Sequence, residues 1–302
     1  MTSRRAAARL LGRLRRRTHT LASPADPVSG VGLHSGRAAS VRLRPAAADE
    51  GVYFVRTDLG EDAPPISASV ASVLGTRLST TLGTAGGATV ATVEHLLAAL
   101  CGAGVSACRV ELDGPEVPLL DGSAAPWVAA VRAAGLARQP RAAPAHRPRR
   151  PLWVHEGSAW VVALPAAAPS LTYGIDFAGH APIGRQWFSW APDDSDAGDG
   201  ALDRFARELA PARTFALAEH LQGLRDEGLI RGGSAESALV CDRERWLNGP
   251  LRFDEEPARH KTLDLLGDLA LLGALPRARI VAYKAGHRMH VALARKLAEE
   301  AG

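Results

Sequence analysis

Hydrophobic and polar residues follow two different rhythms along the first half of the chain. Residues 38–59 alternate between apolar and polar side chains on either side of a turn, which predicts two strands with one buried face. Residues 88–104 pass from a strand end or loop into an apolar segment closed by a glycine, which predicts a helix. Residues 107–135 predict a strand, a Pro/Gly-rich loop, and a helix capped by Ser123 and ended by Gly135.

The second half has a similar mixture of elements without repeating residue identities. Short apolar segments predict strands, and longer segments with helical periodicity predict helices. A break around Pro211 divides one mainly helical segment. The predicted strands are 159–165, 171–177, 236–242 and 277–286, and the predicted helices are 201–228 with its break, 258–273 and 290–300. The fold class is therefore α+β, with two halves of similar size.

A segment rich in Pro, Arg and Ala separates the two halves. Residues 138–151 have the composition of a linker, so we expect an N-terminal α+β domain at 18–137 and a C-terminal α+β domain at 152–302. Residues 1–17 are expected to be a poorly ordered basic extension. An organelle transit peptide and an arm attracted to anionic lipid are alternatives. The Ala/Arg/Gly-rich composition is typical of a GC-rich bacterium and weakens the transit-peptide interpretation.

The net charge of +4 conceals an acidic body. Residues 1–17 contain seven arginines and residues 138–150 contain five, and neither segment contains an acidic residue. Outside these segments 24 basic residues face 32 acidic ones, which gives a net charge of −8. Nucleic-acid surfaces need clustered positive charge on the fold itself, so we expect no nucleic-acid partner. Three cysteines without a paired framework favour a reducing compartment, and no apolar run is long enough to span a bilayer.

The predicted helix at 258–273 carries polar residues at a spacing that indicates chemistry. His260, Asp264 and Asp268 follow one another in steps of four, which places neighbours on one helix face about 6 Å apart. An imidazole and a carboxylate on one face form half of a zinc site. Alone, this spacing is more often a pair on a solvent-facing surface, so its meaning depends on residues elsewhere in the chain.

Three further clusters supply what such a half-site lacks. Glu94 and His95 begin a helix, and because adjacent helical residues diverge by about 100°, one can bind a metal while the other reaches a bound water. His287 follows a strand and a glycine, and Thr214 lies in the break near Pro211. Each alone has an ordinary structural explanation, such as a first-turn acid or a cap. Together with the helix they form the inventory of a metal-dependent amide hydrolase.

Eight motifs between about residues 28 and 295 occur in a characteristic order: GVGLHSG, TVEHLLAAL, DGPEVPLLDGSAAPWV, ARTF, GLIRGGS, LRFDEE, RHKTLDLLGDL and YKAGH. Through them the sequence resembles the zinc-dependent UDP-3-O-acyl-N-acetylglucosamine deacetylases of Gram-negative bacteria. The resemblance implies removal of the N-acetyl group from UDP-3-O-[(3R)-3-hydroxyacyl]-N-acetylglucosamine, the committed step of lipid A (lipopolysaccharide) biosynthesis. It also implies a two-domain α/β sandwich, with structurally similar domains and the active site between them.

The resemblance implies a role for each residue of the catalytic set. The expected ligands of one Zn²⁺ ion are His95, His260 and Asp264. Glu94 is expected to be the general base that activates water. His287, oriented by Asp268, is expected to be the protonated partner of the oxyanion or of the leaving amine. Thr214 is expected to hydrogen-bond the oxyanion.

The resemblance also implies contacts for the rest of the substrate. The expected substrate-binding residues are Lys261, Phe177, Phe215, Leu229 and Ile230. Lys261 would meet the diphosphate and Phe177 would stack on uracil. An insert near 216–240 would form an apolar passage for the acyl chain, with Leu229 and Ile230 in its wall. His34 is expected to support the cleft rather than to bind metal.

Three alternatives to this function are open at this point. The first is a zinc deacetylase or amidase that acts on another nucleotide sugar. The second is an inactive protein that binds a nucleotide sugar or lipid, which the presence of Glu94, His287 and all three ligands disfavours. The third is a nucleic-acid binder that uses the basic tail, which the acidic body disfavours. We expect a cytoplasmic monomer, with peripheral contact at the inner membrane through residues 1–17.

Overall fold

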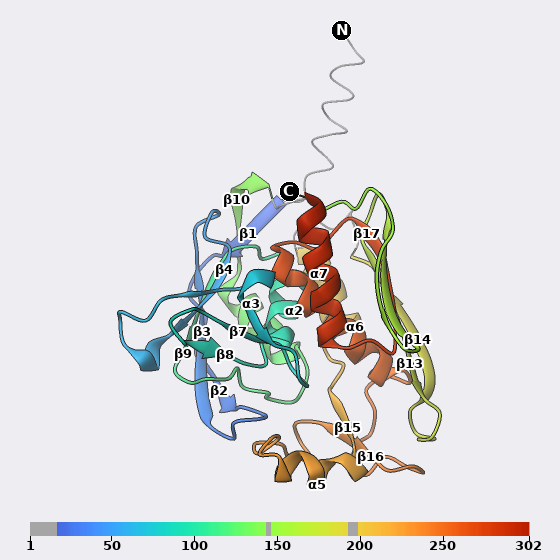
Figure 1. Cartoon of the computed structure of the whole chain (residues 1–302). Coiled ribbons are helices and arrows are strands. Elements are labelled where there is room, and N and C mark those ends of the chain that lie inside the picture. The colour runs from blue at the N-terminus through green and yellow to red at the C-terminus, as the bar shows by residue number, and fades with distance from the viewer. Residues whose placement is uncertain (1–16, 143–145, 193–198, 302) are drawn as a thin grey trace.

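The computed structural model describes residues 17–142, 146–192 and 199–301. In it, a layer of helices lies between two five-stranded sheets (Figure 1). The first sheet has the order β2 (Val28–Val31), β3 (Ala38–Pro45), β9 (Cys108–Leu112), β4 (Val52–Arg56) and β5 (Ile66–Ser67). The second has the order β11 (Leu152–Glu156), β12 (Ala159–Pro165), β17 (Ala278–Tyr283), β13 (Ser170–Phe177) and β14 (Gly184–Trp190). The predicted α+β class is confirmed.

The two sheets share one pattern of strand pairing. Each contains a single parallel pair, β4 with β9 in the first and β13 with β17 in the second. Every other pair in both sheets is antiparallel. Parallel neighbours need a long crossover connection, and the helices α2 (Glu94–Gly102) and α6 (Glu256–Leu269) lie in these two connections. The fold therefore brings one crossover helix from each half into the layer between the sheets.

The inner face of each sheet is apolar because alternate residues point toward the helices. In β3 the buried residues are Ala39, Val41 and Leu43, and β17 buries Ala278, Ile280 and Ala282 in the same alternation. The helices α3 (Ala125–Ala134) and α7 (His287–Ala301) follow β9 and β17 and complete the central layer (Figure 1). The alternation predicted for residues 38–59 is confirmed by β3 and β4.

A close approach of α2 and α6 fixes the centre of the molecule. A Cβ atom on Gly267 would lie 2.1 Å from the backbone oxygen of Glu94, so only glycine allows the two helices to meet there. Gly267 lies in the last turn of α6, and Glu94 is the first residue of α2. The contact places the beginning of α2 against the last turn of α6.

Smaller elements complete the structure. A three-stranded sheet precedes α2, and the segment 199–241 contains the insert that lies at one end of the molecule, apart from the two large sheets (Figure 1). The strands of these parts are β6 (Val73–Gly75), β7 (Thr81–Gly83), β8 (Thr89–Val90), β15 (Phe215–Leu217) and β16 (Leu239–Cys241), and the helices are α4 (Asp199–Glu208) and α5 (Ala218–Asp226). Short 3-10 turns occupy Thr57–Leu59, Val70–Ser72 and Ala270–Leu272. Among the described residues no helix is long and apolar enough to cross a bilayer.

The structure differs from the sequence-based expectation at the predicted linker. Residues 138–142, expected to be linker, belong to the strand β10 (Leu136–Ala142), which pairs antiparallel with β1 (Arg17–Leu21). Pro140 lies where the register shifts, so its missing N–H removes no ladder hydrogen bond. The proline and arginine content of residues 138–142 predicts a linker. The strand forms only by pairing with β1, which is more than 100 residues away in the sequence. The rest of the predicted extension, residues 1–16, lies outside the described residues, and the domain limits stay a prediction.

Two helices also differ from expectation. The helix predicted at 258–273 spans Glu256–Leu269, and twelve of its residues are buried. The last helix begins at His287 rather than at 290. All three cysteines are free thiols, and Cys108 and Cys241 are buried, which agrees with the absence of a disulfide framework.

Candidate active site

Three side chains from the two crossover helices converge in the central layer. His95 lies in the first turn of α2, and His260 and Asp264 lie one turn apart on α6. The Nε2 atoms of His95 and His260 lie 3.5 and 3.3 Å from Oδ1 of Asp264. The three donor atoms all lie within 4.8 Å of one another, and all three residues are buried. Two imidazoles and one carboxylate form the donor set typical of a catalytic zinc ion.

The protonation of this group suits a metal ligand set. His260 Nδ1 lies 3.0 Å from the carbonyl oxygen of Ala212, which accepts only from an N–H, so Nε2 keeps its lone pair toward Asp264. Burial lowers the pKa of His260 to about 4, so its ring is neutral at pH 7. Burial opposes ionisation of Asp264, but His260 and Lys261 outweigh it and keep the pKa of this carboxyl well below its usual range.

Glu94 lies beside this group and uses only one of its oxygens. Its Oε2 accepts the backbone N–H of Thr80 at 3.0 Å, and Oε1 lies 3.9 Å from Nε2 of His287. Burial raises the pKa of the Glu94 carboxyl, although the charges of His287 and His95 oppose that effect. A carboxylate with a raised pKa is a better proton acceptor near neutral pH.

Asp268 is the centre of a second buried cluster, behind His287. Its Oδ2 accepts Nδ1–H of both His287 and His290 at 2.8 Å, and its Oδ1 accepts the hydroxyl of Thr80 at 2.6 Å. Burial alone would lower the pKa of His287, but Asp268 and Glu94 outweigh it and raise the pKa to about 9. Burial alone would raise the pKa of Asp268, but His287 and His290 outweigh it and lower the pKa to about 2. His287 is therefore cationic at neutral pH.

The converging residues open onto a cavity of about 720 Å³. Its wall includes members of both crossover helices and the end of β13. The predicted residues that line it are Glu94, His95, Phe177, Thr214, Phe215, His260, Lys261, Asp264 and His287. Asp268 lies behind His287 and does not line the cavity. The rings of Phe177 and Phe215 meet edge to face with centroids 5.5 Å apart. Two apolar rings thus adjoin the charged part of the cavity.

A second cavity of about 390 Å³ shares Thr214 and Phe215 with the first. Leucine side chains dominate its wall, and Ile230 contributes to it. Leu229, which we also expected there, is not among the lining residues. His34 lines this cavity, and neither of its ring nitrogens has a hydrogen-bond partner among the described residues. Most of the expected site residues therefore surround two connected cavities.

The sequence analysis did not identify three residues of the site, which are Thr80, Tyr173 and His290. Thr80 contacts both Glu94 and Asp268, and His290 shares Asp268 with His287. Nε2 of His290 in turn lies 2.9 Å from the hydroxyl of Tyr173. A threonine before a strand and a tyrosine in an apolar strand have no distinctive spacing. His290 stands three residues after His287 at the start of a helix, and this i, i+3 spacing is the one signal that would have indicated it.

Comparisons with known proteins identify the family of the chain. Residues 18–299 match the family model described as UDP-3-O-acyl N-acetylglycosamine deacetylase. A UDP-3-O-acyl-N-acetylglucosamine deacetylase of Nostoc sp. is 51% identical over 286 residues, which cover 92% of this chain and 97% of the relative. One from Anaeromyxobacter dehalogenans is 46% identical, with 89% and 83% covered. A probable mitochondrial one from Arabidopsis thaliana is 40% identical, with 92% and 87% covered. The chain belongs to this deacetylase family.

The family is zinc-dependent, and the residues present fit that metal. The group has two imidazole nitrogens and a carboxylate, without a thiolate, and it faces a cavity of about 720 Å³. A catalytic zinc site takes three such protein ligands and leaves one position open. The carbonyl of Ala212 orients His260 from behind, as outer contacts of zinc ligands commonly do.

Proposed function

We propose that His95, His260 and Asp264 hold one Zn²⁺ and that the surrounding residues use it to remove the N-acetyl group from UDP-3-O-[(3R)-3-hydroxyacyl]-N-acetylglucosamine. The family assignment makes the chain a UDP-3-O-acyl-N-acetylglucosamine deacetylase of the committed step of lipid A biosynthesis. The observation that supports the zinc mechanism is the convergence of three metal-binding side chains, with the carboxylate of Glu94 beside them. Only Oε2 of Glu94 accepts a hydrogen bond, from Thr80. A zinc ion held there supplies a Lewis acid that polarises the amide carbonyl and makes water more acidic.

Glu94 acts as the general base. Its free oxygen, Oε1, accepts a proton from the attacking water, while the Thr80 N–H keeps the other oxygen in place. The raised pKa of Glu94 brings its proton affinity closer to the working pH. Because Nε2 of His287 lies 3.9 Å from Oε1, the carboxylate and the imidazolium can both reach the same reacting group.

His287 supplies positive charge and a proton beside Glu94. Asp268 accepts its Nδ1–H, so Nε2–H points toward Glu94 and the cavity. From that position it stabilises the oxyanion of the tetrahedral intermediate or protonates the leaving amine. The Thr214 hydroxyl is the second donor to the oxyanion. Thr214 is fixed by its backbone, since its N–H donates to Gly122 and its carbonyl accepts from Leu239, each at 2.8 Å.

The rest of the substrate occupies the two cavities. Lys261 has three ammonium donors, of which one contacts Asp264 at 2.5 Å, and the others serve the diphosphate. The ring of Phe177 stacks on uracil, with Phe215 packed against its edge. The leucine-rich second cavity, with Ile230 in its wall, takes the acyl chain. Each CH₂ group buried there contributes about 0.8 kcal/mol, which a bare UDP-sugar does not provide.

Acetate release tests this function directly. The purified protein, supplied with the acylated UDP-sugar, releases acetate, loses that activity after treatment with a chelator and regains it with Zn²⁺. UDP-N-acetylglucosamine without the acyl chain is turned over far more slowly. Activity that survives complete metal removal contradicts the zinc mechanism, and equal turnover of the two sugars contradicts the acyl passage.

The remaining expectations stay predictions. Structural similarity of the two whole domains is supported by the shared pairing pattern of the sheets. A monomeric state, a cytoplasmic location and peripheral membrane contact through residues 1–17 stay predictions, and residues 1–16 lie outside the described part of the chain.

A further inference from the structure

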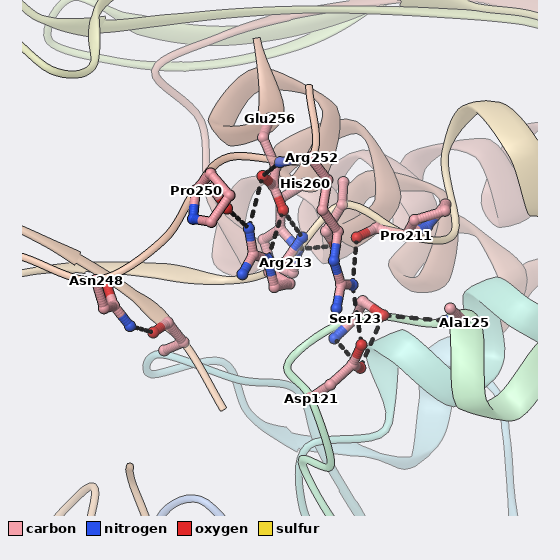
Figure 2. Close-up of polar contacts among 12 residues, drawn as sticks. Asp121, Ser123, Ala125, Pro211, Arg213, Asn248, Pro250, Arg252, Glu256 and His260 are labelled. Carbon is pink, nitrogen blue, oxygen red and sulfur yellow. Dashed lines mark hydrogen bonds and ion pairs between the residues drawn. The ribbon is translucent and has the colours of Figure 1, made fainter. Parts of the chain in front are cut away.

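A buried ion pair lies at the beginning of the ligand-bearing helix α6. Glu256 is fully buried, and its carboxylate accepts four N–H groups (Figure 2). Three come from Arg213, through its backbone N at 3.0 Å, Nε at 2.8 Å and Nη2 at 3.1 Å, and the fourth is the backbone N–H of Arg252 at 2.6 Å. Burial alone would raise the pKa of Glu256, but these hydrogen bonds outweigh it and lower the pKa, so the pair is charged.

The segment that carries Arg213 also carries two groups of the active site. On one side of Arg213, the carbonyl of Ala212 accepts Nδ1–H of His260 at 3.0 Å (Figure 2). On the other side, Thr214 lines both cavities. Glu256 and His260 are four residues apart on α6, so the helix that bears the metal ligand also holds the segment that orients it. Arg213 therefore lies between two residues that belong to the site.

A second contact, made by Arg252, links the segment 211–214 to the N-terminal half. Nη1 of Arg252 donates to Oδ2 of Asp121 at 2.9 Å and to the carbonyl of Pro211 at 2.8 Å (Figure 2). Oδ1 of Asp121 accepts N–H and O–H of Ser123, just before α3. Arg252 and Asp121 are each about a third exposed, so this pair alone contributes little stability. The contact instead joins the segment 211–214 to Asp121 of the N-terminal half through Arg252.

We propose that the Glu256–Arg213 pair is a positioning pair, which sets the Ala212 carbonyl against His260 and holds Thr214 in the cavity. This inference rests on the proposed zinc function. Neither residue lines the cavity, so the pair acts through its neighbours rather than on the substrate. A fixed carbonyl keeps the His260 ring in the tautomer whose Nε2 can bind metal. Partners of this kind change metal affinity about 10–100-fold when they are lost.

The test compares Arg213→Lys and Glu256→Gln with Arg259→Lys as a matched control. Arg259 lies on the same helix and pairs with Glu255 at 2.7 Å, but it donates to Glu208 rather than to the segment 211–214. For each variant we measure the melting temperature, the Zn²⁺ affinity by titration against a competing chelator, and kcat and KM. We expect Arg213→Lys to weaken Zn²⁺ binding about 10-fold or more and to lower kcat with little change in KM. Glu256→Gln keeps the shape of the side chain but replaces one acceptor oxygen by an NH₂ group, so two of the four N–H groups lose their acceptor, and we expect an effect of the same kind.

The control separates positioning from general loosening of the helix start. Arg259→Lys lowers the melting temperature but leaves the Zn²⁺ affinity and kcat within about 2-fold of the unmodified protein. Folded Arg213→Lys and Glu256→Gln variants with unchanged Zn²⁺ affinity and kcat would overturn the proposal, as would an equal loss in Arg259→Lys. If Arg213→Lys fails to fold, Glu256→Gln decides. Failure of the unmodified protein to bind Zn²⁺ or release acetate would instead overturn the proposed function.

Discussion

The two halves of the molecule use the same sheet pattern but place their chemistry differently on the crossover helix. In the N-terminal half, Glu94 and His95 occupy the first turn of α2. In the C-terminal half, His260 and Asp264 lie in the interior of α6, and Asp268 lies in its last turn. Interior residues are positioned by the helix itself, because its hydrogen bonds fix their spacing. First-turn residues depend on what packs against the helix end, and for α2 this is the Thr80 segment and Gly267.

The largest expected effect comes from removing a ligand on either helix. His95→Ala and His260→Ala should each abolish tight Zn²⁺ binding and reduce acetate release to less than about one-hundredth, because a tridentate set loses a third of its donors. Metal content by mass spectrometry and turnover measure this. His155→Ala, an exposed histidine on β11, is the control and keeps both. A His95→Ala variant that retains metal would show that α6 alone forms the site.

Removing the base should separate metal binding from catalysis. Glu94→Gln keeps the shape of the side chain but cannot accept the proton, so we expect turnover to fall about 10²–10⁴-fold while bound Zn²⁺ stays near one per chain. The Thr80 N–H still has an oxygen to donate to, so the start of α2 stays in place. Unchanged turnover in a metal-loaded Glu94→Gln variant would contradict the role given to the first turn of α2.

The pH dependence of stability and turnover tests the role of the His287–Asp268 ion pair in the C-terminal half. Since the pKa of His287 is raised from 6.5 to about 9, its ion pair stabilises the fold fully below pH 6.5, and that contribution is lost as the pH rises through 9. Asp268, with a pKa of about 2, contributes above pH 3.8 and loses this contribution only as the pH falls through 2. Turnover should decline on the alkaline side, and Asp268→Asn should move that decline to lower pH. An identical alkaline limb in both proteins would exclude His287 as its source.

The contact between the helices predicts an effect on stability as well as on rate. Gly267→Ala places a methyl group 2.1 Å from the Glu94 carbonyl, so the start of α2 must move. We expect a loss of about 1–3 kcal/mol in the free energy of unfolding, with a fall in kcat. Gly223→Ala in α5 meets nothing within 4 Å and should stabilise the protein by about 0.5–1 kcal/mol. Chemical denaturation with a kinetic assay measures both, and equal behaviour of the two variants would refute the close contact.

The smallest effect concerns the second imidazole on Asp268. His290→Leu removes one donor from Asp268, so this carboxylate holds His287 less firmly, and we expect kcat to fall roughly 10-fold. His290→Asn keeps an N–H near the Nδ1 position and should recover most of that rate. Measuring kcat and melting temperature together shows whether the loss is one of positioning. Equal kcat values for the two variants would leave His290 with a packing role alone.

Much of the element order followed from the sequence, because alternation and helical periodicity are local properties. The strands 159–165 and 171–177 were predicted close to where β12 and β13 lie. The strand β10 was missed because its proline and arginine content indicates a linker, and only pairing with β1 makes it a strand. Ile230 lines the second cavity and Leu229 does not, and the spacing within the insert does not show which of the two faces inward.

By itself, the sequence determined the family, the α+β class and the i, i+4 spacing of His260 and Asp264, since these depend only on neighbours along the chain. Tertiary structure decided which residues meet. Thr80 joins Glu94 to Asp268, and Ala212 meets His260, across 14 to 188 residues of chain. It also decided the protonation of His287, because burial and a carboxylate from another helix set its pKa. Such effects depend on distance and solvent exclusion in the folded chain, which no local pattern of residues records.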